Sequence, residues 1–336
     1  MAFPERQHNE HEYRLYATLG GDFSTSLTAI AVYPEGKFLA ASSKDGRIGI
    51  YGLNGSVKLR TSFSVGDTVP TALAWGLGTE LVVGLNDGRL MLFPRATKTY
   101  GWLVDLLKRV GSSKQDSDSL EIADLGASIN TLTFQKETKR LFAAHGSEVS
   151  VLRRKNTNSW PTSRTINPPA LDLTPIQVDL QAPYPVKVHL SRWEDQIIVC
   201  YRDHGIRAYS ISDAKDTEVV WQILPEKRIC ASGLSPNSHH IAAWNLDTGL
   251  DLYTTMRSSH QVVDTIRLTD NFGIDTNCML DVEFVSEREI VVGSNVGTPF
   301  IINFSQGLQN RILDVAERIF LWNDLPPAHL GPPSLG

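Results

Sequence analysis

Hydrophobic and polar residues alternate along most of the chain, in short runs that are separated by polar turns. The stretch that begins at Leu27 reads LTAIAVYPEG, then KFLAASSKDG, then RIGIYGL, so apolar alternation resumes after each turn. Alternation with a period of two is typical of β-strands, and Asp-Gly between two such runs is a strong hairpin signal. The pattern therefore predicts three consecutive antiparallel strands between residues 27 and 53.

The same order of strand, turn, strand, turn and strand recurs five more times. Candidate fourth strands lie between these triplets at 57–63, 119–125, 217–223 and 261–268, with a less clear one within 160–180. Four short strands that repeat every 42 to 59 residues are typical of the blades of a β-propeller. The later triplets begin at Pro70, Ile129, Val186, Ile229 and Met279.

Residues at equivalent positions of the six units support this alignment of the repeats. The second turn of most units holds an aspartate or asparagine, and a large apolar residue follows six positions later. An Asp or Asn side chain in a tight turn bonds its own backbone, so we expect these residues to stabilise turns rather than to bind a metal. The turn residues are Asp45, Asp87, Gly146, Asp203, Asp247 and Asn295, and the apolar residues are Tyr51, Phe93, Leu152, Tyr209, Tyr253 and Ile301.

Two segments, AVYPEGKFLAASSKDGRIGIY (31–51) and GLSPNSHHIAAW (233–244), resemble the repeat of the WD-repeat β-propeller family. In that family each unit runs through a Ser-x-Asp turn, matched here by Ser43 and Asp45, to a closing Trp-Asp. Tyr, Phe, Leu or Ile stands at the closing position in this chain, and Asp22-Phe23 stands where the family has Gly-His. The resemblance covers about residues 12–314 and implies a propeller. Because of these departures, we expect its blades to be held together mainly by apolar packing.

The number of blades stays open at this point. The strand at 12–19 is expected to be an outer strand that closes the ring by pairing with the last blade. The sixth triplet is already followed by LQNRILDV, a possible outer strand of its own, and then by ERIFLW. An incomplete seven-blade ring is therefore favoured over six blades with one surplus strand. The predicted organisation is a disordered N-terminus (1–11), a propeller (12–322) and a Pro/Gly-rich tail (323–336).

Alternation also predicts which residues of the inner strands are buried. Residues at every second position share one face of a strand, and the apolar set should lie between blades. The predicted set is Ile30, Val32, Leu73, Trp75, Leu132, Phe134, Val188, Leu190, Val282 and Phe284.

The segment 98–118 departs from the repeat. Its apolar residues recur with the spacing of a helix, which predicts a helix over 100–110, whereas the polar run GSSKQDSD predicts poor order over 111–118. The apolar stripe is expected to pack on the edge of the second blade, and docking to a partner is the alternative. The candidate protein-binding residues are Trp102, Leu103, Leu106, Leu107 and Val110, together with Trp193, an aromatic residue in a charged turn.

The composition and charge of the chain argue against several classes of function. The net charge is -5, which gives no basic field for nucleic acid or anionic lipid, and no run approaches 18 apolar residues. The first fifteen residues lack the apolar region of a secretory signal, and three scattered cysteines fit neither a disulfide framework nor a zinc site. We therefore expect a cytoplasmic or nuclear protein without a nucleic-acid or membrane partner.

No catalytic motif is found: the sequence has no Gly-x-Ser-x-Gly elbow, His-Glu-x-x-His helix, phosphate loop or dinucleotide fingerprint. We predict a non-catalytic scaffold for protein–protein interaction, without a cofactor, that works as a monomer or as a subunit of a larger complex. A propeller hydrolase with a central metal-dependent site is the first alternative, since loops can supply converging carboxylates. A glycan-binding propeller is the second, although the tryptophans share no single column.

Overall fold

The computed structural model of the chain describes residues 13–19, 23–97, 119–156, 159–169, 182–192, 196–212, 218–224, 227–255, 262–267, 281–293, 300–304, 309–312 and 319–324. The N-terminus expected to be disordered, the insertion at 98–118, Trp193 and Asn295 lie outside these residues. The predicted helix and its apolar stripe therefore stay predictions, as does the tail beyond residue 324.

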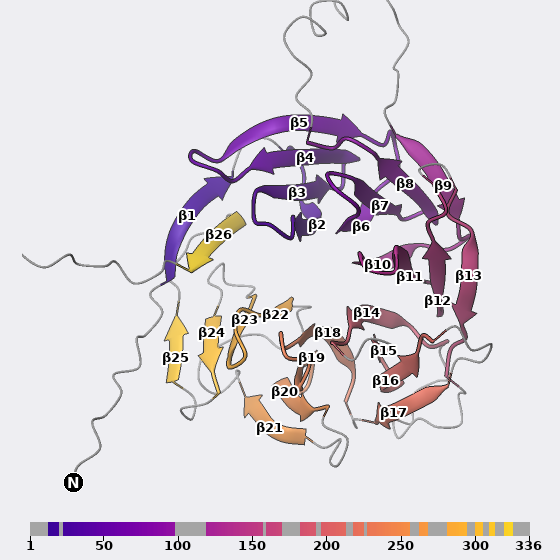
Figure 1. Cartoon of the computed structure of the whole chain (residues 1–336). Coiled ribbons are helices and arrows are strands. Elements are labelled where there is room, and N and C mark those ends of the chain that lie inside the picture. Colours follow the sequence, from indigo (N-terminus) through magenta and orange to yellow (C-terminus); the bar gives the residue numbers. More distant parts are fainter. Residues whose placement is uncertain are drawn as a thin grey trace, which may run out of the picture.

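The predicted all-β propeller is confirmed. Six four-stranded antiparallel sheets follow one another around a ring in chain order, and the described residues contain no helix (Figure 1). Blade 1 holds β2 (Leu27–Val32), β3 (Phe38–Ser43), β4 (Arg47–Gly52) and β5 (Lys58–Ser64), blade 2 holds β6 (Pro70–Trp75), β7 (Leu81–Leu85), β8 (Arg89–Phe93) and β9 (Leu120–Asp124), and blade 3 holds β10 (Ile129–Gln135), β11 (Arg140–His145), β12 (Glu148–Arg153) and β13 (Thr162–Ile166). Blade 4 holds β14 (Pro185–Leu190), β15 (Gln196–Tyr201), β16 (Gly205–Ser210) and β17 (Val219–Ile223), blade 5 holds β18 (Ile229–Leu234), β19 (His240–Asn245), β20 (Gly249–Thr254) and β21 (Val262–Arg267), and blade 6 holds β22 (Val282–Phe284), β23 (Glu289–Val292), β24 (Phe300–Asn303) and β25 (Gln309–Ile312).

The turn between β3 and β4 shows how the local sequence makes a hairpin. Gly46 has a φ of 77°, and a Cβ at this position would lie 2.3 Å from the carbonyl oxygen of Gly66. Glycine is therefore the residue that this turn requires. The N–H of Gly46 donates to the carbonyl of Ser43 at 3.1 Å, which closes the turn.

The inner strands share one register, and two of their positions point toward the preceding blade. In blade 2 these positions hold Leu73 and Trp75, which pack against Ala29 and Ala31 of blade 1. The indole Nε1 of Trp75 also donates to the carbonyl of Ala31 at 2.9 Å. We call these two positions the backward pair. In blades 1 to 6, the second member of the pair is paired across to the second strand of its own blade, with Leu39, Leu81, Leu141, Ile197, Ile241 and Ile290 in turn.

Polar contacts add to this packing between blades. Thr133 of blade 3 donates through Oγ1 to the carbonyl of Val188 in blade 4 at 2.7 Å. Arg154, which follows β12, donates through Nη2 to Oε1 of Glu80 in blade 2 at 2.7 Å, and its guanidinium lies 5.5 Å from the ring centroid of Trp160. Blades 1 to 4 are thus joined to one another by apolar burial and by hydrogen bonds.

A two-stranded sheet occupies the place between blade 6 and blade 1. It consists of β1 (Tyr13–Leu19) and β26 (Ile319–Asp324), which pair in antiparallel fashion, with β1 on the outer side (Figure 1). The strand predicted at 12–19 is therefore present, and its partner is β26 rather than a strand of blade 6. The ring holds six full blades and, at a seventh position, two strands.

The predicted core is partly correct. Leu73, Trp75, Leu132, Val188, Val282 and Phe284 are buried, and Phe134 and Leu190 are half-buried. Ile30 and Val32 are 51% and 56% exposed, so their predicted burial is wrong. The physical reason is the incomplete blade beside them.

Candidate protein-binding site

The face of blade 1 that points toward the seventh position is open along its inner strand. Ile30 and Val32 are the backward pair of β2, and both are more than half exposed. The equivalent residues of blade 2, Leu73 and Trp75, are no more than 8% exposed. The difference therefore comes from what lies next to the strand, because the residues are apolar in both blades.

The short connection before β26 explains why the seventh position lacks two inner strands. In each full blade from the second onward, the chain leaves the outer strand of the preceding blade and forms two inner strands before it reaches the third strand. This connection runs over 23 residues (125–147) at its shortest and 38 residues (167–204) at its longest. Between β25 and β26 it has only six residues, 313–318, which is too few for two strands and their turns. β26 therefore stands in the third position of a seventh blade that lacks its two inner strands.

The opposite wall of this position, on blade 6, is also exposed. Glu283 on β22 is exposed, and Val285, which follows the strand, is 42% exposed. Val291, which pairs with Glu283, is half-buried. Its equivalents in the other five blades are fully buried, namely Ala40, Val82, Phe142, Ile198 and Ala242. Both walls thus show the exposure expected where two inner strands are absent.

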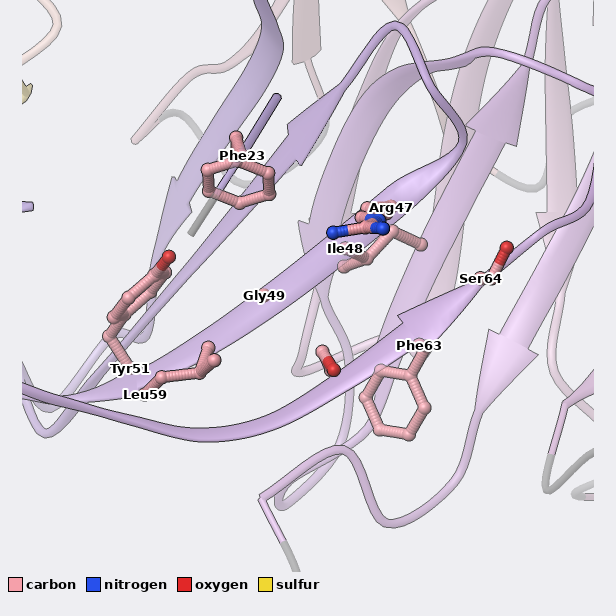
Figure 2. A pocket seen from close by; sticks show the side chains of 9 residues that line it. Phe23, Arg47, Ile48, Gly49, Tyr51, Leu59, Phe63 and Ser64 are labelled. Carbon is pink, nitrogen blue, oxygen red and sulfur yellow. The ribbon is translucent and has the colours of Figure 1, made fainter. Parts of the chain in front are cut away.

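The outer half of the same face of blade 1 carries a pocket of about 310 Å³ (Figure 2). Phe23 and Tyr51 stand over Gly49, with ring centroids 6.4 Å apart, and Leu59 is 41% exposed. Gly49 leaves the floor open, because a Cβ there would lie 3.2 Å from both Phe23 and Leu59. The pocket is lined by Phe23, Arg47, Ile48, Gly49, Tyr51, Leu59, Ser62, Phe63 and Ser64.

A hydrogen-bonded aspartate lies beside this face. Asp45 accepts hydrogen bonds from Ser24 Oγ at 2.6 Å and from Ser43, and these bonds lower the pKa of its carboxyl to about 2. Arg47, which lines the pocket, has its Nε 3.6 Å from Oδ2 of Asp45. The pair therefore adds a polar border to an apolar surface.

We call the exposed residues Ile30, Val32 and Leu59, together with the pocket beside them, the open face. Its exposed side chains are apolar, and Leu39 and Tyr51, which lie between Val32 and Leu59 on the same face, are buried. Such a surface can bind an apolar partner surface.

The other predicted turn residues occupy turns of different construction. Asp87 accepts from the backbone N–H of Arg89 at 3.2 Å and from its Nε at 2.8 Å. Asp203 forms an ion pair with Nε of Arg228 at 2.8 Å. At the turn that contains Asp247, the side chain of Asn245 accepts from the N–H groups of Asp247 and Thr248. Asn245, which the column of aspartates did not include, therefore organises that turn.

Buried titratable groups lie away from the open face. His189 is bonded to Ser232 Oγ at 2.9 Å across blades 4 and 5, and burial lowers its pKa to about 3. Burial raises the pKa of the Cys200 thiol to about 12, so this cysteine is not a reactive thiolate at neutral pH. Within the described part of the chain, no three His, Cys, Asp or Glu side chains come close enough together to hold a metal ion.

The chain was compared with models of protein families and with curated proteins. No protein-family model matches it, and the search of curated proteins gave no match. Nor do the described residues include a helix long and apolar enough to cross a membrane. The six-blade propeller is therefore the level at which the chain is classified, and its WD-repeat resemblance rests on the two segments quoted above.

Sequence reasoning missed the residues that form this site. Ile30 and Val32 were expected in the core, while Leu59 and Val285 were not singled out. The available signal was the short distance between the outer strand of the sixth unit and ERIFLW, since every other unit places two strands in that interval.

Proposed function

We propose that this protein is a non-catalytic scaffold of the WD-repeat type that binds another protein through its open face. The observation that supports the proposal is the exposure of Ile30 and Val32 at positions where the other blades bury apolar side chains. Clustered exposed apolar residues on a folded protein mark interaction sites more often than scattered ones do.

The energetics of the open face favour a macromolecular partner. Complete burial of a valine, leucine or isoleucine side chain contributes about 1.5–3 kcal/mol. The three exposed residues Ile30, Val32 and Leu59 lie on the inner and outer strands of one blade and can therefore anchor an interface with another protein. The propeller supplies a rigid support for them, whether the protein acts as a monomer or as a subunit of a larger complex.

The hydrolase and glycan-binding alternatives have less support. A central metal site needs converging ligands, and the described residues hold no such group. A glycan site needs exposed aromatic rings, whereas the buried tryptophans Trp75, Trp160 and Trp244 serve as packing residues.

Affinity capture with matched variants tests the proposal. The bait is the full chain, and the test variant carries Ile30→Asp and Val32→Asp, which places two carboxylates on the open face. The control is Val220→Asp, because Val220 on β17 is a comparably exposed valine, 46% exposed, on an outer strand far from this face. We expect a protein that the wild type and the control retain and that the double variant loses. Equal capture by all three proteins would contradict the proposal.

A further inference from the structure

We propose that the occupant of the seventh position is a β-hairpin from a different protein, which adds two strands to the free edge of β26 and completes the blade. This inference rests on the proposed scaffold function and specifies its partner.

One edge of β26 is available for pairing with a further strand. The two-stranded sheet pairs one side of β26 with β1, and the described residues provide no strand on its other side. An unpaired strand edge presents backbone N–H and C=O groups that an incoming strand can pair with. In every full blade this side of the third strand pairs with the second strand.

The seventh position calls for two further strands rather than one. The full blades place two strands inside the third one, and the described part of the chain places none there at the seventh position. A single strand would pair with β26 but would stand in the second position, so Ile30 and Val32 on the innermost strand would stay uncovered. A hairpin of two antiparallel strands supplies both the pairing and the cover.

The segments on either side of β26 are poor sources of this hairpin. The connection 313–318 is too short to form it. The residues after β26 read LPPAHLGPPSLG, with prolines at four of the twelve positions. Proline has no N–H for a strand ladder and is excluded from paired central strands. Neither of the two segments that flank β26 suits a paired hairpin, so we assign the hairpin to a separate protein.

The contacts between full blades predict the side-chain pattern of the hairpin. Where one blade meets the next, small residues of the preceding inner strand face the backward pair. Ala29 and Ala31 face Leu73 and Trp75, and alanines of β6 pack with Leu132 in the same way. The inner strand of the partner should thus present small residues, two apart, toward Ile30 and Val32. Large apolar residues at the alternate positions should face Val285 on blade 6.

This pattern allows a probe to be taken from the protein itself. Residues 67–87, DTVPTALAWGLGTELVVGLND, contain β6 and β7 with Ala72 and Ala74 on one side and Leu73 and Trp75 on the other. A fluorescently labelled synthetic peptide of this sequence serves as the hairpin probe. A matched peptide with Ala72→Lys and Ala74→Lys places charge where the probe would meet Ile30 and Val32.

Fluorescence anisotropy measures binding of the probe to the full chain. We expect saturable binding to the wild type and to Val220→Asp. For the variant with Ile30→Asp and Val32→Asp, and for the Lys-substituted peptide, we expect binding about tenfold weaker or more, because a carboxylate or ammonium would be buried against apolar atoms. Equal binding by the double variant would overturn the proposal. Thermal unfolding of each variant checks that it is folded, and Val32→Ser replaces the double variant if it is not.

Hydrogen exchange tests the strand pairing separately. The bound probe should slow the exchange of backbone amides within 319–324, since half of the amides of β26 face its free edge. Binding of the probe without this protection would overturn the addition of strands to β26.

A closed variant provides the opposite test. In this chain residues 313–318 are replaced by a copy of residues 65–88, the segment that connects β5 to β8 and contains two inner strands. The closed variant should melt at a higher temperature than the wild type and should not bind the probe. Probe binding equal to that of the wild type would overturn the proposal.

Two other occupants would be recognised in the same experiments. A dimer in light scattering that Ile30→Asp with Val32→Asp dissociates would assign the position to a second copy of the chain. Tighter probe binding after removal of residues 325–336 would assign it to the chain's own tail. Both outcomes overturn the hairpin of a separate protein. If the probe fails but affinity capture still depends on Ile30 and Val32, the scaffold function stands and only the hairpin is rejected.

Discussion

Blades 1 and 2 place apolar residues at the same two positions of their inner strands, with opposite results. Leu73 and Trp75 lie against blade 1 and are buried, whereas Ile30 and Val32 face the seventh position and are exposed. The strands have equal lengths and pair with their second strands in the same register. Burial in a propeller is therefore a property of the interface between two blades, and one blade alone does not determine it.

The largest expected effect of this difference is on stability. Trp75→Ala removes a buried indole and its hydrogen bond to Ala31, and should lower the free energy of unfolding by about 3–5 kcal/mol. Val32→Ala removes atoms that are already in contact with water, and should change it by less than about 0.5 kcal/mol. Urea unfolding followed by circular dichroism measures both values. A loss of several kcal/mol in Val32→Ala would show that the face is covered.

A second comparison uses the position between the two members of the backward pair, which points toward the following blade. In blade 4 this position holds His189, which is buried against Ser232 of blade 5, and in blade 6 it holds Glu283, which is exposed. Burial lowers the pKa of His189 from 6.5 to about 3, so the imidazole is neutral in the folded protein. Below pH 6.5 the unfolded chain binds a proton here that the folded chain does not bind. Stability is therefore complete above pH 6.5 and decreases as the pH falls toward about 3.

His189→Gln isolates this contribution. Glutamine keeps a polar group for Ser232 but does not titrate, and the other histidines are the same in both proteins. Between about pH 7 and about pH 5, the free energy of unfolding should decrease by about 2 kcal/mol more in the wild type than in the variant. Denaturant titrations at the two pH values give the numbers. Parallel decreases would show that His189 is accessible to solvent, and blade 5 would then not seal blade 4.

The sequence predicts the strands of this fold well, because each unit carries its own turns and alternation. Gly46 and Asp45 specify a hairpin locally, and the repeat shows that this hairpin occurs in one unit of a ring. Alternation identifies the residues that share a face of a strand, but it does not identify what covers that face. Ile30 and Leu73 are equivalent in pattern, and only the closing of the ring distinguishes them.

The candidate site could not be predicted by searching for chemical motifs, because it contains none. It arises because the six residues between β25 and β26 are too few to form the two inner strands that the other blades have. The repeat pattern favours an incomplete seventh blade, yet the candidate binding residues were expected in the insertion and at Trp193. Where a blade lacks its two inner strands, the facing inner strands of both neighbouring blades are exposed, here at Ile30 and Val285.

Thiol labelling at matched positions is the most direct test of the open face. Ile30 and Val188 are the first members of the backward pairs of blades 1 and 4, and they are 51% and 1% exposed. Ile30→Cys and Val188→Cys are each introduced into a chain in which Cys200, Cys230 and Cys278 are replaced by serine, and maleimide addition is followed by intact-mass spectrometry. The cysteine at position 30 should react as fast as a free thiol in solution, and the cysteine at position 188 only when the protein unfolds. Equal protection of the two cysteines would show that a blade covers this face and would contradict the account.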